Sequence, residues 1–103
     1  MTVGRIWPAE ISEFTDPLSG VAVCRLTAHR GHSHHVYFTN PGCYDDGKRL
    51  LISSDRENRT NLFELELATG ELTQLTYLEP LPLPREVEFL RACASTTNDE
   101  AYY

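Results

Sequence analysis

Residues 61–76, NLFELELATGELTQLT, contain two runs in which apolar and polar side chains alternate. In the first run Phe63, Leu65 and Leu67 fall on one face of an extended chain, because successive strand side chains point to opposite faces. The short Ala-Thr-Gly turn that ends at Gly70 separates the two runs. The pattern therefore predicts two antiparallel β-strands joined as a hairpin.

Further strand signals lie before this hairpin. Residues 45–48, Asp-Asp-Gly-Lys, are typical of a turn between hairpin strands, and the apolar run at 49–54 follows them directly. Another strand is expected within residues 36–44. Together with the hairpin, these strands make a four-stranded antiparallel unit over residues 36–76.

The same pattern recurs at a spacing of about 50 residues. Residues 20–27 resemble residues 70–76, and their Leu-Thr pairs end at positions 27 and 76, 49 residues apart. Residues 46–51 have a weaker echo at 98–103, which starts 52 residues later. Four short strands repeated at this period are typical of β-propeller blades.

We therefore predict an all-β chain that forms a partial β-propeller, with one complete four-stranded blade and parts of two neighbouring blades. The expected segments are an N-terminal extension at 1–19, an outer strand of another blade at 21–27, the complete blade at 36–76, a proline-containing linker at 77–86 and a half blade at 87–103, so that the propeller segment spans 20–103. Propellers close with about four to eight blades, and 103 residues supply fewer than two. The expectation is the N-terminal piece of a longer protein, and the alternative is a small β-domain that closes a ring as a homo-oligomer.

The amino-acid composition of the chain argues against several classes of function. The chain has 9 Lys and Arg against 15 Asp and Glu, a formal net charge of −6, which argues against a nucleic-acid partner. No run approaches the roughly 18 apolar residues of a membrane span, and no signal peptide is evident, so a cytoplasmic location is expected. The three cysteines lie far apart and indicate neither a disulfide framework nor a zinc ribbon.

All four histidines fall within residues 29–35. In an extended segment His32 and His34 share one face and His35 points to the other. Such a pair can begin a transition-metal site, but no third ligand is evident beyond Asp45, Asp46 and Asp55, which are candidates by type, so no metal site is assigned to this chain. The alternatives are a polar loop without metal and a row of imidazoles that lines a substrate site.

A second polar cluster links two predicted strands at residues 55–61. It is either a solvated loop with compensating charges or a site where Arg56 and Arg59 clamp a carboxylate, a task that suits the arginine fork. Asn61 closes the cluster at the start of the next strand. The candidate substrate-binding residues are thus His32, His34, His35, Arg56, Arg59 and Asn61.

These segments together resemble the N-terminal region of the oligogalacturonate lyase family. The resemblance covers residues 20–103, and its most specific parts are the His-rich run at 32–41 and the Ser-Asp-Arg-Glu-Asn-Arg-Thr-Asn entry at 54–61. The Asp-Gly-Lys element at 46–48 and the Leu-Thr pairs are shared with TolB-type propellers in general.

The resemblance implies a seven-bladed propeller that cleaves oligogalacturonides by β-elimination during pectin breakdown in the cytoplasm. It also implies a divalent metal, typically manganese, whose ligands in the family lie in later blades and have no counterpart here. The 103-residue chain alone is therefore expected to be inactive, with a uronate oligosaccharide as the substrate of the longer parent. The alternative is a TolB-like propeller segment that serves as a non-catalytic binding or scaffold module. Self-association through exposed strand edges is a further expectation.

Overall fold

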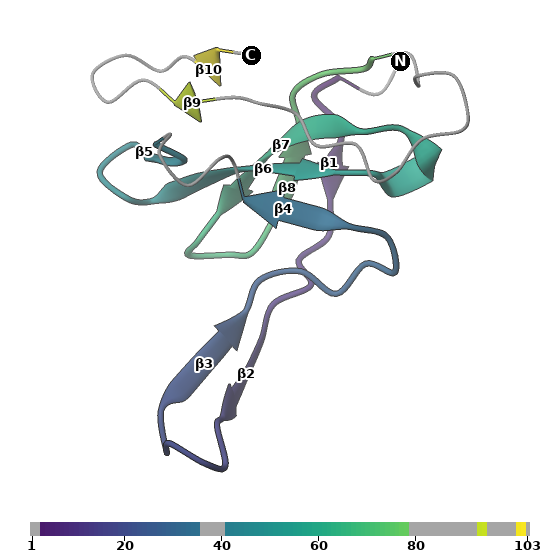
Figure 1. The fold of residues 1–103 in the computed structure, drawn as a ribbon. Coiled ribbons are helices and arrows are strands. Elements are labelled where there is room, and N and C mark those ends of the chain that lie inside the picture. Colours follow the sequence, from purple (N-terminus) through teal and green to yellow (C-terminus); the bar gives the residue numbers. More distant parts are fainter. Residues whose placement is uncertain (1–2, 36–40, 79–92, 95–100, 103) are drawn as a thin grey trace.

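The computed structural model describes residues 3–35, 41–78, 93–94 and 101–102, and these residues form an all-β structure (Figure 1). The elements in chain order are β1 (Ile6–Trp7), β2 (Ser12–Thr15), β3 (Ala22–Arg25), β4 (Ser33–His35), β5 (Cys43–Tyr44), β6 (Arg49–Ser54), the single 3-10 turn η1 (Arg56–Asn58), β7 (Asn61–Glu66), β8 (Leu72–Gln74), β9 (Cys93–Ala94) and β10 (Ala101–Tyr102). No helix among the described residues is long and apolar enough to cross a membrane.

The largest sheet is antiparallel, and its strands follow the order β1-β8-β7-β6-β4, with β5 also paired to β6. Strands β6, β7 and β8 occupy the segments that the alternating pattern predicts. The remaining strand of the blade was expected within 36–44; β5 lies there and β4 just before it, while residues 36–40 fall outside the described part. The open antiparallel sheets confirm an all-β fold and are consistent with a partial propeller.

Both faces of the central strands β6 and β7 are buried. On one face, Phe63 lies opposite Ile52 across the strand pair, and both belong to the apolar core with Leu65 and Leu72. On the other face Leu51 is also fully buried. A strand covered on both sides is expected in a propeller blade, which lies between its neighbours.

The N-terminal 19 residues, expected as an extension, contain two strands. β1 pairs antiparallel with β8 and so adds a strand at the outer edge of the blade. β2 pairs with β3 in a separate two-stranded hairpin, which projects away from the sheet in Figure 1. The segment at 21–27, expected as an outer strand of another blade, supplies β3 to this hairpin.

Two further predictions concern the C-terminal part of the chain. β9 and β10 pair antiparallel within the predicted half blade at 87–103. Most of the predicted linker at 77–86 lies outside the described residues, so its structure stays a prediction.

Candidate functional site

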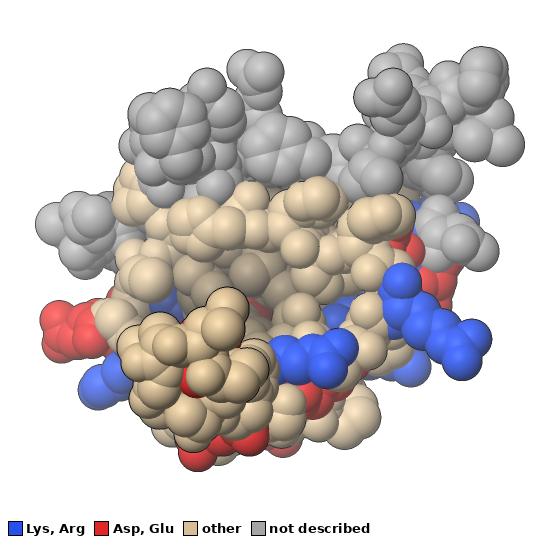
Figure 2. All heavy atoms as spheres, turned by 60° about the horizontal axis from the view of Figure 1, so that its bottom comes forward, with Lys and Arg blue, Asp and Glu red and all other residues tan. Residues whose placement is uncertain are grey.

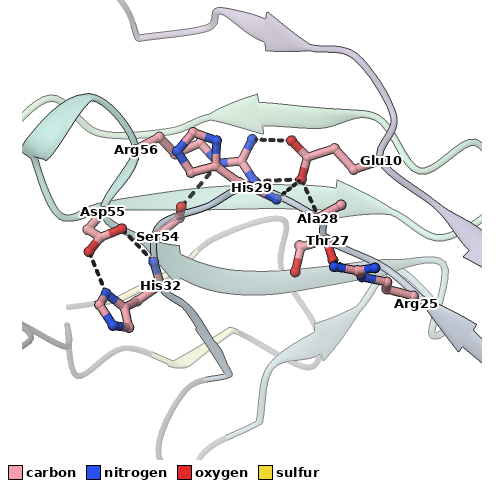
Figure 3. Close-up of polar contacts among 9 residues, drawn as sticks. All are labelled: Glu10, Arg25, Thr27, Ala28, His29, His32, Ser54, Asp55 and Arg56. Atoms are coloured by element: carbon pink, nitrogen blue, oxygen red, sulfur yellow. Dashed lines mark hydrogen bonds and ion pairs between the residues drawn. The ribbon is translucent and has the colours of Figure 1, made fainter.

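His32 and Asp55 are joined by three hydrogen bonds at the end of β6, and Figure 3 draws the two that involve the carboxylate. The backbone N–H of His32 donates to Oδ1 of Asp55 at 2.6 Å, and Nδ1 of the ring lies 2.8 Å from Oδ2. The backbone N–H of Asp55 in turn donates to the carbonyl of His32 at 3.1 Å. The pair therefore fixes one ring nitrogen, while the side chain of His32 remains 56% exposed.

Gly31 makes this pair sterically feasible. A Cβ at position 31 would overlap Oδ1 of Asp55 and would also approach the ring of His29. Only glycine lets the backbone pass this close to the carboxylate. The glycine directly before His32 is therefore explained by the space that the Asp55 carboxylate occupies, which the sequence pattern alone does not show.

His34 lies beside His32 on the same face. The two rings are stacked with centroids 6.0 Å apart and planes inclined by 9°. The structure thus confirms the predicted placement of these two histidines on one face. His35 lies on the opposite side of β4 and is exposed.

The carboxylate of Asp55 is ionised more readily than usual. Partial burial disfavours its charged form, but the hydrogen bonds from the ring and backbone of His32, and the charge of that ring, outweigh burial. The pKa of Asp55 is consequently lowered from its ordinary value. An ionised Asp55 favours a proton on Nδ1 of His32, and Nε2 takes no part in the pair.

Replacing the imidazole tests this coupling. In His32→Ala the ring hydrogen bond and its charge disappear, so the pKa of Asp55 should rise toward its ordinary value. NMR titration of the Asp55 carboxyl carbon measures the change. His35→Ala, an equal truncation on the other side of β4, should leave the Asp55 titration unchanged; an equal shift in both variants would contradict the pairing.

Arg56 does bind a carboxylate, but that of Glu10 in the same chain. Its guanidinium donates from Nη1 to Oε2 and from Nη2 to Oε1, both at 3.0 Å, and its side chain is 0% exposed. Glu10 also accepts the backbone N–H groups of Ala28 and His29 at 3.0 and 3.2 Å. Burial disfavours the charged Glu10, but the hydrogen bond and charge of Arg56 and the two backbone donors lower its pKa overall. The Glu10–Arg56 pair thus connects three segments that lie far apart in the sequence, at residues 10, 28–29 and 56 (Figure 3).

Arg59 and Asn61 contact the segment that follows β8. Nη1 of Arg59 donates to the carbonyl of Leu78 at 3.2 Å, and the guanidinium lies 4.5 Å from the ring centre of Tyr77. The buried Oδ1 of Asn61 accepts from the Thr76 hydroxyl at 2.9 Å and from the Leu78 backbone at 2.7 Å. Both side chains therefore support the local fold, and a contact with substrate stays a prediction for them as for Arg56.

Of the six predicted residues, the structure brings His32 and His34 together and holds Arg56, Arg59 and Asn61 in intramolecular contacts. Sequence reasoning missed Glu10 and Gly31, and it considered Asp55 only as a candidate metal ligand. In the described part of the chain, no three His, Cys, Asp or Glu side chains gather to hold a metal ion. The donor set present here therefore does not fit a manganese site.

Comparison with known proteins shows which solved structures this chain resembles. No protein-family model and no curated protein sequence matches it. Oligogalacturonate lyase from Vibrio parahaemolyticus is 32% identical, with a TM-score of 0.67 over 73% of this chain and 20% of that chain. An oligogalacturonate lyase in complex with manganese is 27% identical, with a TM-score of 0.82 over 100% of this chain and 26% of that chain. This chain thus spans about a fifth to a quarter of the length of these lyases, and over that length it is similar to them in sequence and fold.

Proposed function

We propose that this chain is the N-terminal segment of a cytoplasmic lyase that cleaves oligogalacturonides by metal-assisted β-elimination. The similarity to two oligogalacturonate lyases supports the substrate class and the reaction. In this proposal the 103-residue chain by itself is inactive, because it spans only about a fifth to a quarter of the length of the similar lyases. Its contribution is to bind the anionic sugar.

The observation that carries the proposed role is the geometry of His32. Asp55 holds Nδ1 at 2.8 Å, which fixes the ring of a side chain that is 56% exposed and leaves Nε2 outside the pair. A protonated imidazole then donates in both directions, to Asp55 from Nδ1 and to a uronate carboxylate from Nε2. Such charge-assisted hydrogen bonds are among the stronger polar contacts in proteins.

His34 extends this surface, because its ring is stacked on that of His32. Because the two rings are stacked on each other, the apolar side of a sugar ring can lie only against an outer ring face, and the buried Nε2 of His34 leaves the carboxylate contact to His32. The expected ligand is therefore an acidic sugar with a carboxylate at the edge of its ring.

Titration with digalacturonate tests the proposal. In mildly acidic buffer, NMR resonances of His32 and His34 should shift, and the double variant His32→Gln, His34→Gln should bind about tenfold more weakly, the effect of one lost charge-assisted hydrogen bond of ~1.5 kcal/mol. The matched control is Arg5→Gln, which removes a surface cation that pairs with Glu57.

The same titration tests whether the 103-residue chain lacks lyase activity. When manganese is added, ultraviolet absorbance should show no unsaturated uronate product. Product formed by this chain would disprove the inactivity. Equal affinity of the wild-type chain and the double variant for digalacturonate would show that the two histidines do not bind the sugar. If neither chain bound digalacturonate, the non-catalytic scaffold role would be favoured.

A further inference from the structure

The His32–Asp55 pair has no net positive charge with which to attract an anion. Asp55, whose pKa is lowered, is ionised at neutral pH, and both of its oxygens bind His32. With a protonated imidazole the charges of the pair therefore sum to zero, and with a neutral imidazole the pair is negative. The whole chain has a formal net charge of −6. A uronate that binds at His32 thus needs a further cation close by.

Most of the described Lys and Arg side chains are already engaged within the chain. Some pair with acidic side chains and others donate to backbone carbonyls: Arg5 with Glu57, Arg25 with the Thr27 carbonyl, Arg49 with Asp45 and Glu64, Arg56 with Glu10, and Arg59 with the Leu78 carbonyl. On the face that Figure 2 draws, the Lys and Arg side chains are scattered and acidic side chains lie between them. This face therefore offers an anion no broad basic patch, and attraction depends on single uncompensated cations.

Arg30 is such a cation, and it lies next to the His32–Asp55 pair. Within the described part of the chain, only the side chains of Arg30 and Lys48 are cationic and make no hydrogen bond or ion pair, and both are exposed. Arg30 precedes His32 by two residues, and the backbone of Gly31 between them passes directly against the Asp55 carboxylate. Two residues span at most about 7 Å of chain. The guanidinium of Arg30 can therefore reach a carboxylate bound at His32.

The chemistry of arginine suits this position. Its guanidinium stays charged at every pH at which proteins are folded, and its planar fork of N–H groups matches the two oxygens of a carboxylate. Such bidentate, charge-assisted contacts are stronger than neutral hydrogen bonds. Donation from Nε2 of His32 needs a second proton on the imidazole, whereas Arg30 can donate whether or not that proton is present.

We infer that Arg30 is the residue that selects acidic over neutral sugars at this site, because it binds the uronate carboxylate together with Nε2 of His32. The inference rests on the proposed sugar-binding role of His32. In this arrangement His32 is held in place by Asp55, and Arg30 supplies the positive charge that the pair lacks. A galactose unit has a hydroxymethyl group where galacturonate has its carboxylate, so it gains nothing from that charge.

Calorimetric titration with digalacturonate and with digalactose, its neutral counterpart, tests the inference. Arg30→Gln should weaken the binding of digalacturonate about tenfold, the effect of one lost charge-assisted contact, and should leave the affinity for digalactose unchanged. Arg30→Lys keeps the charge but loses the fork, so its loss should be intermediate. Because the Arg30 side chain is exposed, neither substitution should move the midpoint of urea unfolding. An equal loss for both sugars in Arg30→Gln would overturn the inference.

The matched control is Lys48→Gln, which removes the other uncompensated cation. Lys48 directly precedes β6 and Asp55 directly follows it, so about 20 Å of strand separates this lysine from the site. Lys48→Gln should bind digalacturonate as the wild type does. An equal loss in Lys48→Gln and Arg30→Gln would show that only the net charge of the chain matters, and the inference would then be wrong.

The variant His32→Gln, His34→Gln separates this inference from the proposed function. If the histidine variant binds digalacturonate more weakly and Arg30→Gln binds it as the wild type does, the sugar is bound without Arg30; the inference is then wrong and the proposed function stands. If the wild-type chain does not bind digalacturonate, both are wrong. Weaker binding in both variants, with Lys48→Gln unchanged, is the result expected.

Discussion

Arg56→Ala should destabilise the chain by about 3 kcal/mol, the cost of breaking a buried ion pair from one side. The substitution leaves the Glu10 carboxylate, whose side chain is 21% exposed, without the cation that binds both of its oxygens. It also removes the guanidinium beside Trp7, the single tryptophan of the chain. Urea unfolding followed by Trp7 fluorescence and by circular dichroism measures the loss.

The matched control is Arg49→Ala. Arg49 also pairs with acidic side chains, but it is 35% exposed, so the expected loss is below about 1 kcal/mol. The pH dependence supplies a second control. Because the pKa of Glu10 is lowered in the folded chain, its contribution to the free energy of unfolding is present above the ordinary Glu pKa. It is lost as the pH falls through the lowered value. The difference between wild type and Arg56→Ala should therefore shrink in acid, and a constant difference would argue against the ion pair.

Phe63→Ala should cost about 3–5 kcal/mol, as expected for a large aromatic side chain removed from a packed core. Phe63 is 1% exposed, and its ring meets that of Trp7 edge-on with centroids 6.3 Å apart. The loss should remove most of the stability of a domain at the low end of the ordinary range, roughly 5 kcal/mol. Circular dichroism in the absence of denaturant measures the folded fraction.

Phe14→Ala is the same substitution in the projecting hairpin, where the ring is 53% exposed. At protein concentrations low enough to keep the chain monomeric, it should change the free energy of unfolding by less than about 0.5 kcal/mol. Equal losses in the two variants would mean that the core does not centre on Phe63. Phe63→Leu, which retains most of the apolar volume, should fold and give an intermediate loss.

The strands of the blade were predictable because their signals are local. Alternation over 61–67 places Phe63 and Leu65 in the core, and the Asp-Gly turn before residue 49 marks the start of β6. Each signal lies within one strand or one turn. Nothing distant in the chain is needed to interpret it.

The polar contacts were not predictable in the same way. Glu10 and Arg56 are 46 residues apart, and His32 and Asp55 are 23 apart. Sequence analysis gave carboxylate binding by Arg56 as one of two alternatives, but no pattern along the chain indicates that Glu10 supplies the carboxylate. Such pairs depend on how the N-terminal segment crosses the sheet, which only the tertiary structure shows.

The repeat was recognised from sequence with an error of one residue. Matching the Leu-Thr pairs gives a spacing of 49, whereas the turns and strand registers repeat at 50. The difference matters, because a shift of one residue moves every strand side chain to the other face. Hydrogen-bonded turns are therefore the safer guide to the correspondence between hairpins.

The turns of the β2–β3 and β7–β8 hairpins make the same two backbone hydrogen bonds, 50 residues apart. Between residues 12–25 and 62–75, only the glycine of the turn is identical at that spacing. The same turn geometry is therefore reached with almost entirely different side chains. The left-handed backbone conformation of the glycine, with φ angles of 74° and 79°, is the requirement that both turns share.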